Sequence, residues 1–123
     1  METTFPFKIF ALPPEMRVDD AQYGIMADVE ADPALEGHFY LFEKYGFGGG
    51  GTSWEEHILT ILEEEAPELL EHVDGYSTEA RLLLYADSEA TVRQFMRLIQ
   101  PIFADLGSLN KYFSQTDSSD FFA

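Results

Sequence analysis

The fold is decided by residues 81–104, which read RLLLYADSEATVRQFMRLIQPIFA. Leu82 to Tyr85 is a short run of large apolar residues, which predicts a central strand covered on both faces. Asp87 or Ser88 is a suitable N-cap for a helix that continues to about Ala104, with Pro101 interrupting its last turn. Its apolar residues recur at helical spacing and form one stripe, at Val92, Phe95, Met96, Ile99, Ile102 and Phe103.

The segments before this stretch are typical of strands. Residues 72–77 are expected to pair with residues 81–86 through a turn at Thr78-Glu79. Residues 5–12 form an aromatic and β-branched run that ends at Pro13-Pro14. Two further strands are predicted from alternating patterns, at residues 22–30 and 37–45.

A first helix is expected after the glycine-rich run Gly46 to Gly51. Ser53 with Glu56 three residues later matches a capping box, and apolar residues then recur at helical spacing as far as Leu69. Pro67 should kink this helix or begin a new turn. Residues 106–113 could add one or two further helical turns.

These elements predict an α+β fold in the order β-β-β-α-β-β-α, with an antiparallel sheet of four to five strands covered by two main helices. The length of 123 residues suits one domain, which we place at residues 1–113. The polar segment 114–123 is expected to be a flexible tail.

The charge is strongly negative, because 23 Asp and Glu residues face 7 Lys and Arg residues, giving −16. Nucleic acid and anionic membranes are therefore not expected as partners. The chain has no cysteine, its start at Met1 to Pro6 lacks the features of a signal peptide, and no segment approaches about 20 apolar residues. We expect a cytoplasmic protein.

Motifs for cofactors, metals and catalysis are weak. Gly46 to Ser53 has the glycine spacing of a phosphate loop but lacks its lysine, so no cofactor is expected. His38, His57 and His72 have no compact ligand spacing and are interpreted as strand or surface residues, and no metal is expected. The cluster of Glu63, Glu64, Glu65, Glu68 and Glu71 is interpreted as a solvated helix face rather than a calcium or magnesium site. No serine lies in a nucleophile motif, and with so many carboxylates no single pair indicates an active site.

Part of the chain resembles a known family. The segments that carry the resemblance are residues 47–55, 64–70, 82–88 and 98–103, and the most specific is the glycine loop followed by Trp54-Glu55 and then Ala66-Pro67-Glu68-Leu69-Leu70. In these segments the chain resembles the Immunity protein 51 family. Members are bacterial proteins encoded beside polymorphic toxins, and they protect the producing cell by binding the toxin. The resemblance implies no catalytic residues.

The first hypothesis is therefore an immunity protein, not an enzyme, whose acidic surface occludes the basic active-site surface of a cognate toxin, for example a nuclease. The alternatives are a small hydrolytic enzyme that uses a carboxylate pair, and a general protein-interaction adaptor. For each candidate residue the competing interpretation is a solvated acidic face. Trp54 is interpreted as core rather than as an interface anchor. The expected contact residues are acids of the first helix, Glu55, Glu56, Glu63, Glu64, Glu68 and Glu71, and a second group, Asp28, Glu30, Asp32 and Glu36.

Overall fold

The computed structural model describes residues 4–16 and 21–115. Four strands form one antiparallel sheet in the order β1-β2-β4-β3. The strands are β1 (Lys8–Ala11), β2 (Tyr23–Ala27), β3 (Val73–Gly75) and β4 (Leu82–Ala86). The α-helices are α1 (Glu36–Lys44), α2 (Gly51–Glu65), α3 (Glu89–Phe103) and α4 (Leu106–Ser114), and the short 3-10 helices are η1 (Pro14–Met16), η2 (Pro33–Leu35) and η3 (Pro67–His72).

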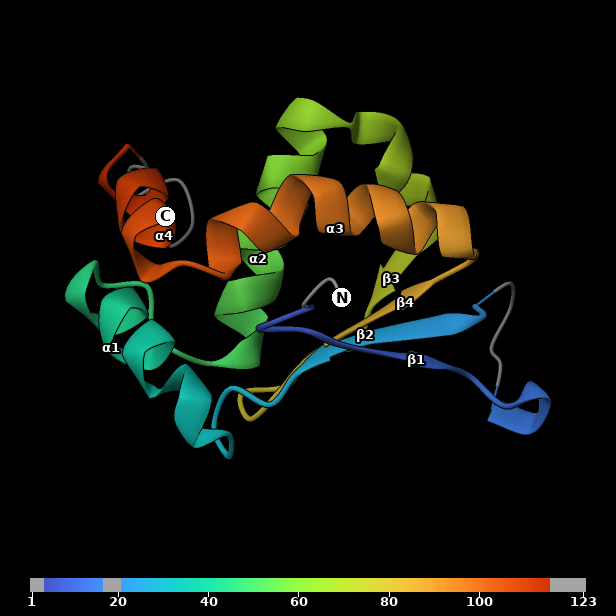
Figure 1. Ribbon diagram of the computed structural model, residues 1–123, viewed down its shortest axis with the longest axis horizontal. Coiled ribbons are helices and arrows are strands. Elements are labelled where there is room, and N and C mark those ends of the chain that lie inside the picture. Colours follow the sequence, from blue (N-terminus) through green and yellow to red (C-terminus); the bar gives the residue numbers. More distant parts are fainter. Residues whose placement is uncertain (1–3, 17–20, 116–123) are drawn as a thin grey trace.

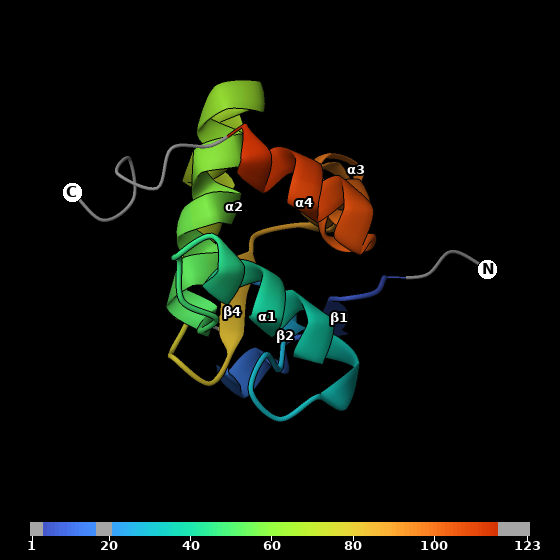
Figure 2. The same ribbon diagram turned by 90° about the vertical axis from the view of Figure 1, so that its left-hand side faces the viewer.

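One face of the sheet carries the hydrophobic core. Ile25 lies opposite Leu84, and both side chains are fully buried under α2 and α3, which lie on the same side of the sheet (Figure 1). α1 and α4 contact each other at one end of the molecule (Figure 2). The alternation along β4 explains this burial, because every second side chain points to the same face.

The helices add an aromatic cluster to the core. Trp54 in α2 is fully buried, as predicted, and its ring stacks on Phe42 with centroids 5.4 Å apart. Phe103 at the end of α3 lies 5.1 Å from the same indole. Ser88 caps α3 by accepting a hydrogen bond from the Thr91 amide, which confirms the predicted start of that helix.

The predicted third strand, residues 37–45, is wrong, because this segment is the helix α1. Its apparent alternation of apolar and polar residues hid a helical pattern in which Leu35, His38 and Phe42 are the buried residues. The element order is accordingly β-β-α-α-β-β-α-α, and four α-helices replace the expected two. The α+β class and the four-stranded antiparallel sheet agree with the prediction.

The predicted capping box is also wrong. α2 begins at Gly51 with Gly50 as its N-cap, and the Ser53 hydroxyl donates instead to the Phe47 carbonyl oxygen at 2.6 Å. Pro67 begins a new helix, η3, as one of the two predicted outcomes. The β3–β4 hairpin closes through a bridge between Thr78 and Arg81, at the predicted turn.

The coverage of β4 differs from the prediction. β4 is central in the sheet, but Leu83 and Tyr85 on its second face are only half-buried. Within residues 4–16 and 21–115, no helix is long and apolar enough to cross a membrane. The predicted tail lies outside the described residues from residue 116 onward.

Candidate functional site: an acidic cleft with aromatic walls

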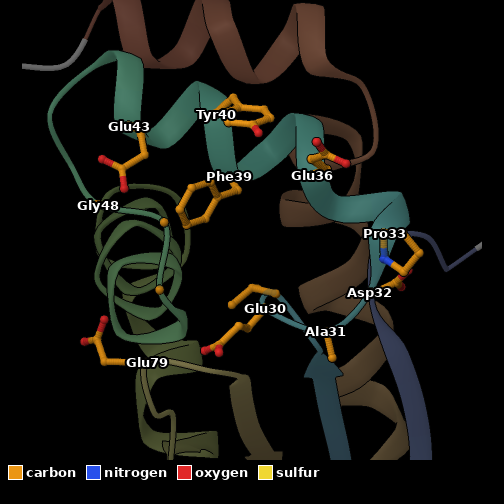
Figure 3. Close-up of a pocket in the computed structure, with 13 residues that line it drawn as sticks. Glu30, Ala31, Asp32, Pro33, Glu36, Phe39, Tyr40, Glu43, Gly48 and Glu79 are labelled. Carbon is orange, nitrogen blue, oxygen red and sulfur yellow. The ribbon is translucent and has the colours of Figure 1, made fainter.

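A cleft of about 720 Å³ lies at one end of the sheet. This volume lies within the range of ligand-binding clefts, about 300–1,000 Å³. Figure 3 shows the side chains that line it. They come from four places, namely the segment after β2, the helix α1, the glycine loop (Gly46 to Gly51) and the β3–β4 turn. The lining residues are Val29, Glu30, Ala31, Asp32, Pro33, Glu36, Phe39, Tyr40, Glu43, Gly48, Gly49, Gly50 and Glu79.

Carboxylates dominate the charge of the cleft. Five of the lining residues are acidic and none is Lys or Arg. Two of the five have structural partners, since Asp32 accepts from the Ala34 amide at 2.9 Å and Glu79 accepts from the Thr52 hydroxyl at 2.7 Å. The other three are Glu30, Glu36 and Glu43, which are exposed and accept no hydrogen bond from any described residue. These three carboxylates are therefore available to a ligand.

Two aromatic rings give the cleft an apolar wall. Phe39 is 39% exposed and Tyr40 is 62% exposed, and their rings pack edge to face with centroids 5.8 Å apart. Figure 3 shows Phe39 pointing from α1 toward the glycine loop, between Glu43 and Glu30. A cation close to such a ring face gains about 0.5–2 kcal/mol. Carboxylates beside exposed aromatic rings suit an organic cation, such as a Lys or Arg side chain, better than an anion.

The glycine loop lies against this wall. A Cβ atom on Gly49 would collide with the ring of Phe39, so a larger residue there would displace this partly exposed ring. A Cβ on Gly51 would collide with backbone atoms of Thr78 and Arg81, where α2 begins against the β3–β4 turn. The Gly51 amide donates to the Glu79 carbonyl oxygen at 3.0 Å. The glycines therefore allow three segments of the chain to meet at the cleft.

No family model matches this chain, and neither does any curated protein or solved structure. The resemblance to the Immunity protein 51 family therefore stays a prediction from the sequence.

Three of the ten predicted contact residues line the cleft. Glu30, Asp32 and Glu36 lie in the cleft, whereas Asp28 lies 3.8 Å from the Arg81 guanidinium. Glu55 does not line the cleft and accepts a hydrogen bond from the Ser77 amide at 3.3 Å.

The other candidates are spread along α2 and into η3. Glu56, Glu63 and Glu64 are exposed on α2, and Glu68 and Glu71 belong to η3 rather than to the first helix. At about 1.5 Å per residue, Glu63 lies roughly 18 Å along α2 from Gly51 at the cleft. Glu63 and Glu64 therefore lie well away from the cleft, whereas Glu56 lies one helical turn from Thr52, whose hydroxyl donates to the cleft residue Glu79.

Four acidic or aromatic residues of the cleft were not predicted as contact residues, namely Phe39, Tyr40, Glu43 and Glu79. Three of them had a usable signal. Glu36, Phe39, Tyr40 and Glu43 are spaced i, i+3, i+4 and i+7, which places them on one face of a helix. This helical spacing was not recognised, because residues 37–45 were interpreted as a strand.

Two of the three histidines differ from their predicted surroundings, whereas His72 lies on the surface as predicted. His38 and His57 are buried in helices, and only His72 is exposed. His38 donates from Nε2 to the Phe103 carbonyl oxygen at 2.6 Å. Burial lowers the pKa of His38 although this hydrogen bond opposes the change, and burial lowers the pKa of His57 to about 4. Both rings are neutral at pH 7.

A second, shallower hollow contains a histidine–aspartate pair, with His72 Nδ1 2.6 Å from a carboxylate oxygen of Asp87. The hydrogen bond and negative charge of Asp87 raise the pKa of His72. Burial raises the pKa of Asp87, but hydrogen bonds from His72 and Thr91 outweigh it, so that this pKa is lowered. No described serine or threonine hydroxyl is hydrogen-bonded to His72, so the pair lacks the arrangement of a nucleophile and its base.

Replacing His72 with asparagine should reduce stability in a narrow pH window. The contribution of His72 is complete below its ordinary pKa and disappears as pH rises through its raised pKa, whereas that of Asp87 disappears as pH falls through its lowered pKa. Urea unfolding should therefore show the largest difference from the wild type between about pH 4 and 6.5. Glu89→Gln, which breaks an exposed pair with Arg93, is the control and should give a flat difference from pH 5 to 8. A His72→Asn effect that grows above pH 8 would contradict this explanation.

Within the described ranges, no three His, Asp or Glu side chains are arranged to hold a metal ion.

Proposed function

We propose that this protein binds a basic partner protein in the acidic cleft, and that it acts as an inhibitor of that partner. The supporting observation is the lining of the cleft, in which Glu30, Glu36 and Glu43 stand beside Phe39 and Tyr40 without any Lys or Arg. A lysine or arginine of the partner would lie against the rings and pair with these carboxylates. The family resemblance makes a cognate bacterial toxin the first partner to test, and its basic active-site surface the region to be covered.

The charge of the whole chain supports the same proposal. A net charge of −16 attracts a cationic protein over distances of about one Debye length, near 8–10 Å at physiological salt. Such attraction raises association rates by about 10- to 1,000-fold. An inhibitor that must capture an enzyme before it acts benefits from this rate. The exposed acids of α2 and η3 contribute to this attraction without forming the contact surface.

Removing three charges from the cleft should weaken the complex far more than removing three charges elsewhere. The test variant is Glu30→Gln, Glu36→Gln and Glu43→Gln combined, and the partner is the product of the neighbouring toxin-like reading frame. Loss of three partly desolvated charge pairs should raise the Kd about 10- to 50-fold in isothermal titration. Protection of cells that express the toxin should fall in parallel.

The matched control is the combination Glu63→Gln, Glu64→Gln and Glu68→Gln, which removes the same charge at the other end of α2. We expect it to lower the association rate slightly and to leave the dissociation rate unchanged. Equal weakening by both variants would show that only the net charge matters, and weakening by the control alone would place the contact on the helix acids. Either result would overturn the assignment of the cleft.

A further inference from the structure

The sheet has a second face that no described helix covers. In Figure 1 the helices α2 and α3 lie on one side of the strands, and the opposite side is open in the described part of the chain. The strand register assigns the side chains of this face, because Lys8, Met26 and Leu83 are paired across the strands and alternate with the core residues. The Tyr76 amide donates to the Leu83 carbonyl oxygen at 2.8 Å, which extends the same row.

The open face is apolar and aromatic at its centre. Phe10 is 38% exposed and Tyr76 is 48% exposed, and the half-buried side chains of Met26, Leu83 and Tyr85 lie between them. The rings of Tyr76 and Tyr85 lie with centroids 4.9 Å apart, and the ring of Phe10 lies over Gly24. Contiguous exposed apolar side chains of this kind mark interaction sites more often than isolated ones.

Among the described residues, the charged side chains of this face occur in opposite pairs, although the whole protein carries −16. Lys8 lies on the edge strand β1 and Asp74 lies on the opposite edge strand β3. Arg81 and Asp28 form a further pair, at the end where β2 pairs with β4. A basic partner gains little from such a face, whereas a second copy of the chain meets no local excess of like charge among these four residues.

We propose that this face is a dimer interface, in which two copies of the protein pack their sheets face to face. A twofold axis parallel to the strands puts β1 of one copy opposite β3 of the other, so that Lys8 faces the strand that carries Asp74 of the second copy. Four strands of up to five residues span about 15–20 Å in each direction, a small footprint for a permanent dimer. We therefore expect reversible dimers with a Kd of about 1–100 µM.

Sedimentation velocity of the full chain over a range of concentrations tests the proposal. The wild type should shift from monomer to dimer, and Tyr76→Asp should weaken the dimer at least about tenfold by placing a charge in the apolar centre. Tyr40→Asp is the matched control, because Tyr40 is also an exposed tyrosine but lies in the cleft. A wild type that stays monomeric up to about 1 mM would overturn the proposal. So would a dimer that Tyr76→Asp leaves unchanged.

A charge swap checks the arrangement of the two copies. Lys8→Glu and Asp74→Lys should each weaken the dimer several-fold, and the double variant should recover the wild-type affinity. Additive weakening in the double variant would exclude the proposed twofold axis. This interface is separate from the cleft. Binding of a basic partner can therefore fail while dimerisation is observed, and dimerisation can fail while binding of a basic partner is observed.

Discussion

When the pH is lowered from 8 to 4, the free energy of unfolding is expected to fall by about 3 kcal/mol more in the wild type than in the His57→Gln variant. His57 is fully buried beside Phe42, Phe47 and Phe113, with ring centroids 5.8, 4.3 and 5.1 Å away. Burial lowers its pKa from 6.5 to about 4. The unfolded chain therefore binds a proton that the folded chain does not, and stability falls as pH drops from about 6.5 to about 4.

The measurement is urea unfolding of the wild type and the His57→Gln variant at pH 8, 6.5, 5 and 4. The variant should be less stable at pH 8, because it loses packing and the hydrogen bond that joins His57 Nδ1 to the Tyr112 hydroxyl. The difference in the free energy of unfolding between the wild type and the variant should then shrink by about 3 kcal/mol toward pH 4. The carboxylates do not affect this difference, because they titrate in both proteins. His57→Leu, which also cannot titrate, should behave in the same way. A constant difference across this range would show that His57 does not titrate anomalously.

Replacing Gly51 with alanine is expected to destabilise the protein by about 3 kcal/mol. This corresponds to a decrease of roughly 10 °C in the melting temperature. The added methyl group would meet backbone atoms of Thr78 and Arg81, and backbone cannot rotate away as a flexible side chain can. The start of α2 and the β3–β4 turn must therefore separate. The hydrogen bond from the Gly51 amide to the Glu79 carbonyl oxygen would weaken with this movement.

Thr52→Ala is the control for this prediction. It changes the next residue in the helix and removes one exposed hydrogen bond, to Glu79, which should cost less than about 1 kcal/mol. Thermal unfolding followed by circular dichroism compares the two variants directly. If Gly51→Ala unfolds within about 2 °C of the wild type, the close approach of α2 to the turn does not constrain the fold.

Parts of the fold were predictable because local signals agreed with the tertiary structure. The run Leu82 to Tyr85 followed by the Ser88 cap placed β4 and α3 correctly. Pro67 and the Thr78-Glu79 turn marked real boundaries as well. In these segments the hydrophobic period, the cap and the breaker residues all indicate the same element.

The segment of α1 was mispredicted for a physical reason. Its buried face includes His38, which counts as polar in a hydrophobic pattern but here is a neutral core residue that stacks on Trp54 with centroids 5.4 Å apart. Without His38 the helical stripe is incomplete, and Phe39 and Leu41 then suggest alternation. The cleft depends on α1, so its aromatic wall was not predictable until this helix was recognised.

The cleft also depends on contacts between residues far apart in the sequence. Glu79 reaches it from the β3–β4 turn, which lies next to Gly50 only because α2 begins against that turn. No repeating pattern in the sequence predicts that Glu79 and Gly50 lie close together. The distance of Glu63 and Glu64 from the cleft likewise depends on how α2 is placed against the turn.

The two stripes of α1 have a consequence for how this protein can diverge. The inward stripe, Leu35, His38 and Phe42, is fixed by packing, whereas the outward stripe, Glu36, Phe39, Tyr40 and Glu43, contributes to the cleft from partly or largely exposed positions. Changes in the outward stripe can therefore accumulate with little loss of folding stability, apart from Phe39, which is constrained by Gly49. Because the outward stripe is confined to one face of one helix, a few substitutions there would let related chains bind new partners while the packed core stays the same.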